Sequence, residues 1–493
     1  MNLQDLIDTH SSQPGDNIAI KHKTAKLSYS ELPAALDVMS QNTKVLACAR
    51  VAVILPDGIG TSLLYLQLFL SRAIVIPISN RSSAINIANI LGRIKAQFVL
   101  TNRATYKKHA CLFQTIQCMI VEQTNKETPH FELIQPAFGI PEMPSWNTCQ
   151  FLPESDLRVV LFTSGSTGEP KGVCLSESNI LSAASMMAHF LDLGPDRQTI
   201  VTPPSFDYYG YIQIFGHIMR GSGIIVGESI AFMGSLIKAI EEGSPTDLAI
   251  VPYAMQQMLN VLENKSSKLL NKLSVITSSS DTLSETLLKR SFAMNPNLTI
   301  FDIYGLTEAG RACYKRIKQA PSFSTSLGNP SPGVELFLDG TGNGDLVGEI
   351  IIKGPNVAKG YFREIKNEGI EIDPIDSVRT GDLGSLNSSG EIVLIGRKDH
   401  MINIMGEKIH PTEIETLAMK VEGIQDAAAR SKELSDGRNT ICLDVVCADL
   451  NPATKADLLD LILNRLGRAF VPEEINSVSR IKRTELGYKV KRN

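Results

Sequence analysis

Hydrophobic and polar positions alternate with two different periods through the first third of the chain. The segments 27–42 and 62–72 are predicted as helices, whereas 51–56 and 73–79 are short apolar runs typical of buried strands. Helices that alternate with buried strands favour βαβ units around a mainly parallel sheet. We therefore expect an α/β fold.

A polar loop follows the next apolar run. Leu157–Phe162 indicates a buried strand and 178–191 indicates a helix, with the sequence LFTSGSTGEPKG at 161–172 spanning the connection. Small and hydroxyl side chains allow backbone N–H groups and hydroxyls to converge on an anion, and α/β proteins bind ligands at strand ends. The candidate phosphate-binding residues are Thr163, Ser164, Gly165, Ser166, Thr167, Gly168 and Lys171.

Two other interpretations of this loop explain less. Glycine and serine are common in surface turns for conformational reasons alone, but this run of hydroxyl and glycine residues is longer than a turn needs. A Walker-type loop requires Ser or Thr directly after its lysine. Gly172 follows Lys171, so we predict a different kind of phosphate loop.

Polar residues also interrupt apolar segments further along the chain. Asp207 lies in the sequence PPSFDYYG, and it is either a turn residue that bonds its own backbone or a buried charge that needs a cation. A strand is predicted to end at Ser278–Ser280, before a helix capped by Asp281 or Ser284. His217 is predicted to be a structural residue on a helix.

Turn chemistry predicts two elements in the last third. The segment 333–362 contains two strand-like runs around a Gly/Asn/Asp turn, which indicates a hairpin. Pro411 is expected to open a helix with Ile414, Leu417 and Val421 on one face.

Composition and charge narrow the class of protein. The 493 residues are 43% hydrophobic and 20% charged, as in a globular protein with more than one domain. A net charge of −4 gives no reason to expect a nucleic acid partner, and the longest apolar run is far shorter than the roughly 20 residues of a membrane span. Without a signal-peptide pattern or CxxC spacing, we expect a reduced, cytoplasmic protein that has no metal cluster.

Several motifs occur in an order that resembles one enzyme superfamily. LFTSGSTGEPKG, FDIYGLTEAGR, RTGDLG, GRKD and a terminal Lys-x-x-Arg follow one another along most of the chain. The sequence therefore resembles the adenylate-forming enzymes, which include acyl-CoA synthetases, peptide-synthetase adenylation domains and luciferases. The resemblance implies a large N-terminal domain, residues 1–397, with stacked, mainly parallel sheets and a β-rich subdomain. It also implies a small α+β C-terminal domain, residues 398–493, that rotates on a hinge.

The resemblance assigns roles to individual residues around ATP and Mg²⁺. It implies that Tyr304 stacks on adenine, Glu308 helps to hold Mg²⁺ and Asp382 binds the ribose hydroxyls. Lys489, Glu308 and Thr163 are the implied catalytic residues. The implied ATP-binding set is the phosphate loop together with Ser279, Tyr304, Gly305, Thr307, Asp382 and Arg397.

The same resemblance implies further residues for the substrate, the hinge and the thiol. Asp207 matches a position that pairs with a substrate amino group. Arg311 either forms a surface salt bridge or points inward to a carboxylate or other polar end of the substrate. Asp399 is the expected hinge, and Gly406 is expected near the tunnel for a pantetheine thiol.

The expected reaction is activation of a carboxylic acid by ATP through an acyl-adenylate, followed by transfer to a thiol. The leading interpretation is loading of an amino acid or similar small acid onto a carrier-protein phosphopantetheine. An acyl-CoA or aryl-CoA ligase is the alternative, because the sequence around GEKIHPTEIE resembles CoA ligases more closely. A catalytically silent, ATP-binding scaffold protein is a third possibility, from another class.

Overall fold

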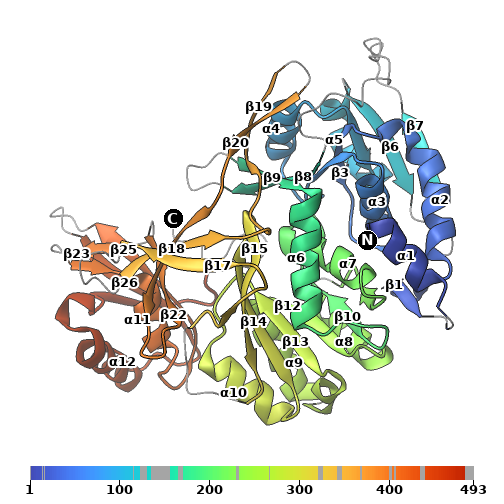
Figure 1. Ribbon diagram of the computed structural model, residues 1–493. Helices are drawn as coiled ribbons and strands as arrows, with labels where there is room; N and C mark the ends of the chain where they lie inside the picture. The colour runs from blue at the N-terminus through green and yellow to red at the C-terminus, as the bar shows by residue number, and fades with distance from the viewer. Residues whose placement is uncertain are drawn as a thin grey trace.

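A computed structural model gives the architecture of most of the chain. It describes residues 2–13, 15, 17–114, 116–122, 130–134, 156–164, 170–228, 232–265, 267–319, 326–340, 347–366, 369–398, 402–404, 407–433 and 439–482. Two large sheets form the main body, and a smaller group of strands and helices from the C-terminal part lies to one side (Figure 1).

The first nine-stranded sheet contains the stem of the phosphate loop. Its order is β20-β19-β9-β8-β4-β3-β5-β6-β7. Its central strands are parallel, and antiparallel strands flank them. The strands are β3 Arg50–Ile54, β4 Ile74–Pro77, β5 Phe98–Thr101, β6 Gln117–Glu122, β7 His130–Ile134, β8 Leu157–Ser164, β9 Pro170–Ser176, β19 Gly360–Lys366 and β20 Gly369–Pro374.

The second nine-stranded sheet has the order β16-β15-β14-β13-β12-β10-β11-β1-β2. It is parallel from β1 to β14 except at its edge strand β2, and the β14–β15 hairpin is antiparallel. The strands are β1 Ile18–His22, β2 Ala25–Ser28, β10 Gln198–Val201, β11 Gly223–Ile225, β12 Asp247–Ile250, β13 Val275–Ser279, β14 Thr299–Leu306, β15 Ala309–Ile317 and β16 Asn329–Pro330.

A hydrophobic core shared by the two sheets contains residues of five helices. It joins strands of both sheets to α1 Leu3–Ser11, α2 Leu32–Thr43, α3 Ile59–Leu70, α6 Glu177–Phe190 and α7 Tyr208–Ile218. The residues of α3 from Gly60 to Phe69 are all buried, as expected for a helix that is apolar on every side. The α/β prediction is therefore confirmed.

Separate cores cover the other faces of the sheets. Helices α4 Ala84–Ile94 and α5 Arg103–His109 pack on the other face of the first sheet. Side chains of α4 and of the sheet's strands form the hydrophobic core between them. Helices α8 Met233–Glu242, α9 Pro252–Lys265 and α10 Glu285–Met294 pack on the second sheet. Ser284 accepts a hydrogen bond from the Leu287 N–H and caps α10, which confirms one of the two predicted caps.

A four-stranded antiparallel sheet forms the β-rich region. Its order is β17-β18-β21-β22, with β17 Glu335–Asp339, β18 Val347–Lys353, β21 Val378–Leu386 and β22 Ile392–Arg397. The predicted pairing of the two strands within 333–362 is confirmed by the β17–β18 register.

The C-terminal part has its own hydrophobic core. It contains α11 Pro411–Ala418, α12 Pro452–Leu466 and the sheet of β25 Ile424–Glu433, β26 Asn439–Cys447 and β27 Glu474–Ser477. A two-stranded ribbon, β23 Ile402–Ile404 and β24 Glu407–Ile409, precedes α11. Ile414 and Leu417 are buried in this core, as predicted, but α11 ends at Ala418, so Val421 packs against the core from beyond the helix. The division at residue 397 and its hinge stay predictions.

One local expectation was wrong. The phosphate loop joins two antiparallel strands, because Pro170–Ser176 continues the ladder as β9 before α6 begins. Cys48 takes part in a disulfide, and six other cysteines within the described residues are free thiols. Within the described residues no group of three or more His, Cys, Asp or Glu side chains could hold a metal, and no helix there is long and apolar enough for a membrane span.

Candidate active site

The stem of the phosphate loop is the β8–β9 hairpin. Thr163 lies opposite Lys171, and Ser164 lies opposite Pro170. The Thr163 hydroxyl donates a hydrogen bond of 3.4 Å to the Lys171 carbonyl oxygen. Arg93 donates to the Pro170 carbonyl and lies over the ring of Phe162, so the stem is anchored from α4. The predicted residues Gly165, Ser166, Thr167 and Gly168 lie outside the described residues.

Glu308 lies in the two-residue turn that joins β14 to β15. Leu306 pairs with Ala309, which leaves Thr307 and Glu308 at the tip. The Glu308 carboxylate accepts a hydrogen bond of 3.1 Å from the Tyr361 hydroxyl, and its carbonyl oxygen accepts the Ala358 N–H at 2.8 Å. The carboxylate is therefore held in place by the segment that enters β19.

Tyr361 connects this turn to the phosphate loop. The Nζ atom of Lys171 lies 5.9 Å from the centre of the Tyr361 ring, within the range of a cation–π contact. Partial burial, followed by the nearby Glu308 carboxylate, raises the pKa of Tyr361 well above its usual value. The hydroxyl therefore stays protonated and donates to Glu308. Sequence reasoning missed this residue.

Tyr304, Asp382 and Arg397 form a second group beside the same hairpin. The Tyr304 hydroxyl donates to Asp382 Oδ2 at 2.6 Å, and Arg397 Nη1 lies 3.4 Å from Asp382 Oδ1. Burial and then the Asp382 carboxylate raise the pKa of Tyr304 well above its usual value. A carboxylate can accept several hydrogen bonds at once, so Asp382 joins Tyr304 and Arg397 in one group.

The backbone around Asp382 fixes this arrangement. Asp382 and Arg397 are register partners on β21 and β22. The Thr380 hydroxyl accepts the Asp382 N–H at 3.0 Å, and the Thr380 carbonyl accepts from Arg397 Nη1 at 2.7 Å. Gly381 has a left-handed φ of 70°, and a Cβ atom there would lie 2.9 Å from the Arg397 guanidinium. Thr380 is a second positioning residue that the sequence did not reveal.

Two further predicted residues pack against the hairpin. The Ser279 hydroxyl donates to the Ile303 carbonyl at 2.8 Å, next to Tyr304. A Cβ atom at Gly305 would lie 2.7 Å from the Arg311 nitrogen, so only glycine fits between the strands at this point. The ladder also shifts register between Tyr304 and Leu306.

The two predicted substrate residues have different environments. Asp207 is the N-cap of α7 and accepts the Tyr208 N–H at 2.8 Å, which is the backbone-bonding role that its sequence position allowed. Arg311 is only 3% exposed, so its interpretation as a surface salt bridge is wrong. Its guanidinium lies 4.6 Å from the centre of the Tyr209 ring. Lys489, Asp399 and Gly406 fall outside the described residues.

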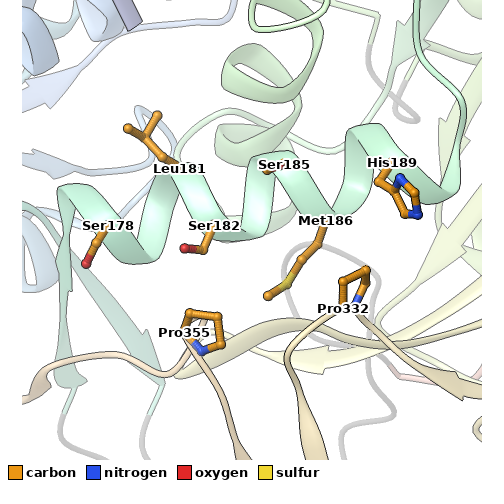
Figure 2. Close-up of a pocket in the computed structure, with 8 residues that line it drawn as sticks. All are labelled: Ser178, Leu181, Ser182, Ser185, Met186, His189, Pro332 and Pro355. Atoms are coloured by element: carbon orange, nitrogen blue, oxygen red, sulfur yellow. The ribbon is translucent and has the colours of Figure 1, made fainter. Parts of the chain in front are cut away.

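A groove of about 570 Å³ runs along the outer side of α6. Figure 2 shows Ser182 and Met186 on the side of the helix that faces Pro355 and Pro332. Of the eight residues that line it, only His189 is titratable, and none is a predicted site residue. Met186 packs in the same hydrophobic cluster as Ala309 and Ala312 of β15, so the groove adjoins the β14–β15 hairpin without containing a predicted site residue.

The fold and these residue groups are those expected of the adenylate-forming enzymes that the motifs resemble. The two nine-stranded sheets and the four-stranded sheet bring the phosphate-loop stem, a carboxylate at a hairpin tip and a Tyr–Asp–Arg group together around the β14–β15 hairpin. The family model of the AMP-binding enzymes matches residues 7–362, so the chain belongs to that family.

Comparison with known proteins agrees with this assignment. Isonitrile lipopeptide synthase of Streptomyces coeruleorubidus is 26% identical over 99% of this chain, although the chain spans only 33% of that protein. Indoleacetate–CoA ligase of Aromatoleum aromaticum is 24% identical, with 99% of this chain and 96% of that protein covered. The amide bond synthetase McbA from Marinactinospora thermotolerans has the same fold, with a TM-score of 0.79, 18% identity, and coverage of 99% of this chain and 97% of that one.

Proposed function

We propose that the protein activates a small carboxylic acid with ATP and then passes the acyl group to a phosphopantetheine thiol. The observation that carries this proposal is the convergence of Lys171, Glu308, Tyr304 and Asp382 around one hairpin. Each type of side chain suits one part of a bound nucleotide. A hydroxyl-rich loop with a cation suits phosphates, and a carboxylate, which can accept two hydrogen bonds at once, suits ribose hydroxyls.

In this proposal the Tyr304 ring lies against adenine, and Ser279 supports the adjacent backbone. Asp382 accepts hydrogen bonds from the ribose, and Arg397 holds Asp382 or reaches a phosphate. Tyr304 is well suited because its hydroxyl is fixed to Asp382 at 2.6 Å. A fixed ring loses little conformational freedom when a base stacks on it.

Glu308 fits the role of a magnesium ligand. Mg²⁺ prefers hard oxygen ligands and usually takes one or two carboxylates together with substrate phosphates and water. Glu308 supplies one such carboxylate, and Tyr361 fixes its direction. When bound, the ion would neutralise phosphate charge.

The chemical steps need no covalent enzyme nucleophile. The substrate carboxylate oxygen forms a bond to the α-phosphorus of ATP, and the bond to the leaving pyrophosphate breaks. The thiol sulfur then attacks the acyl carbon, AMP leaves, and the thiol proton passes to solvent. In the first step Lys489, Lys171 and the Thr163 loop would stabilise the developing negative charge. Rotation about Asp399 would then bring Gly406 toward the thiol.

The identities of the thiol acceptor and of the carboxylic acid form the more specific part of the proposal. Loading of an amino acid onto a carrier protein is one candidate, in line with the peptide-synthase relative. Transfer to CoA is the other, in line with the full-length CoA ligase. Capping of α7 explains Asp207 without a substrate amino group, and this observation favours acids that lack such a group.

The decisive experiment is exchange of labelled pyrophosphate into ATP, without thiol, over a panel of amino, fatty, aryl and dicarboxylic acids. We expect acid-dependent exchange that needs Mg²⁺. Thioester formation would then be followed with CoA and with a phosphopantetheinylated carrier protein as competing acceptors. Silence with every acid, together with retained ATP binding in calorimetry, would favour the scaffold alternative.

A further inference from the structure

Arg311 is a buried cation that has no anionic partner within the part of the chain that the structure describes. The residue is 3% exposed, and its Nε and Nη2 atoms are buried without a hydrogen-bond acceptor. A buried, unpaired charge is strongly unfavourable. A protein retains such a group when a ligand supplies the missing partner, since perturbed buried charges cluster at functional sites.

Two tyrosines lie near the guanidinium. It lies 4.6 Å from the centre of the Tyr209 ring, and the Tyr209 hydroxyl is bonded to Thr277. The neighbouring Tyr208 hydroxyl is also buried without a partner. Burial lowers the pKa of Arg311 from its usual value, and the two tyrosines partly oppose this shift. A cation–π contact compensates only part of the cost of burial.

Three carboxylates of the site form hydrogen bonds with groups other than Arg311. Asp207 accepts the N–H of Tyr208 as the cap of α7. Glu308 accepts the Tyr361 hydroxyl, and Asp382 is bonded to Tyr304 and faces Arg397. No ion pair joins Arg311 to any carboxylate among the described residues.

The backbone holds Arg311 in an unusual conformation. Its φ is 62°, in the left-handed region that an arginine rarely adopts. Ser331 donates a hydrogen bond to the Arg311 carbonyl, and Gly305 packs directly against its nitrogen. Backbone strain of this kind persists where the surroundings enforce it, and it is concentrated at functional sites.

Arg311 is also close to the proposed nucleotide site in the chain and in space. It follows Glu308 by three residues on the same hairpin, and its backbone contacts the Gly305 that follows Tyr304. Its side chain extends to the N-terminal turn of α7 at Tyr209. A substrate that extends from the reacting centre toward α7 would therefore meet the guanidinium.

We propose that the acid activated here carries a second carboxylate, and that Arg311 binds it. This inference rests on the proposed function and narrows its substrate class to dicarboxylic acids. The guanidinium presents donors in a planar fork that matches a carboxylate. Because the Arg311 side chain is buried, an acid that lacks the second charge leaves the guanidinium unpaired, and we expect strong discrimination against that acid.

The test compares dicarboxylic acids of increasing length with their monomethyl esters in pyrophosphate exchange. The ester keeps the reacting carboxylate and most of the shape but removes the second charge. For the best acid, kcat/KM should exceed that of its ester by about 10²-fold or more. Arg311→Met should bring this ratio close to one. Arg316→Met is the matched control, because Arg316 is an exposed arginine of the same strand that contacts the Phe301 ring, and it should keep the ratio.

A second measurement separates a ligand-binding role from a structural one. If Arg311 awaits a ligand, Arg311→Met should leave the melting temperature of the ligand-free protein unchanged or raise it, because an unpaired buried charge is removed. A large loss of thermal stability would instead identify a structural cation and overturn the proposal.

The remaining outcomes are also distinct. Equal turnover of acid and ester by the unchanged protein, or an equal loss of both in Arg311→Met, would overturn the second-carboxylate assignment. Exchange with monocarboxylic acids alone would do the same while upholding the proposed function. Silence with every acid would overturn the proposed function and this inference with it.

Discussion

The Asp382→Asn variant tests the nucleotide site most directly. Asp382 accepts a hydrogen bond of 2.6 Å from Tyr304, and its side chain is 12% exposed. A hydrogen bond to a charged group contributes about 1.5–3 kcal/mol, against roughly 0.5–1.5 kcal/mol for a neutral pair. An asparagine oxygen still accepts the Tyr304 hydroxyl, so we expect a loss of about 1–1.5 kcal/mol in the free energy of unfolding.

The effect on ATP binding should be larger than the effect on stability. The amide keeps only one acceptor oxygen, and that oxygen is already used by Tyr304. If the carboxylate binds both ribose hydroxyls, the variant loses two charge-assisted bonds. At the lower figure of about 1.5 kcal/mol for each bond, the loss is about 3 kcal/mol, or roughly a 150-fold rise in the KM for ATP.

The assay is pyrophosphate exchange with ATP varied at saturating acid, together with urea unfolding of the same samples. Asp339→Asn is the matched control. Asp339 is an exposed aspartate in the same four-stranded sheet, and it pairs with Arg379. It should change neither quantity appreciably, since exposed pairs contribute little. An unchanged KM for ATP in Asp382→Asn would refute the ribose assignment, even if stability falls as calculated.

Three further predictions concern other parts of the site. Tyr361→Phe removes the 3.1 Å hydrogen bond to Glu308. The rate of pyrophosphate exchange should therefore fall about 10-fold, and half-maximal exchange should require a higher Mg²⁺ concentration. An unaltered dependence of exchange on Mg²⁺ would contradict this role. Burial is the main reason that the pKa of Asp302 is raised to about 7. Between about pH 4 and pH 7 the native state therefore binds more protons than the unfolded state. The free energy of unfolding consequently falls as the pH rises through this range. Asp302→Asn should therefore stabilise the protein more at pH 8 than at pH 5, and equal effects in urea unfolding at the two pH values would exclude this. Lys489→Ala should slow adenylation by about 10²-fold or more but spare thioester formation from preformed adenylate, and equal losses in both steps would refute its assignment.

The sequence predicted those features that depend on local physics. The buried strand β3 and the central helix α3 follow from continuous apolar runs, and the pairing of β17 with β18 follows from turn chemistry. The cap at Ser284 follows from the preference for a hydroxyl acceptor at a helix N-terminus. Each of these signals lies within a few residues of the element that it specifies.

The contacts that assemble the site have no local signal. Tyr361 reaches Glu308 because β19 pairs with β9, and Thr380 holds Asp382 and Arg397 because β21 pairs with β22. Such contacts depend on strand register between distant segments. For the same reason the burial of Arg311 could not be predicted, because its exposure depends on the position of α7 relative to β15.

An irregular strand pair explains why side chains of one hairpin reach two different parts of the site. The β14–β15 register shifts between Tyr304 and Leu306, Gly305 lies against the Arg311 nitrogen, and Arg311 has a φ of 62°. A bulge of this kind changes the direction of the side chains on either side of it. Tyr304 thereby reaches Asp382 in the four-stranded sheet, whereas Arg311 reaches Tyr209 on α7. A regular ladder would alternate its side chains strictly between the two faces of the sheet. The bulge therefore allows the proposed nucleotide and substrate contacts to share a short hairpin, and a periodic sequence pattern cannot reveal it.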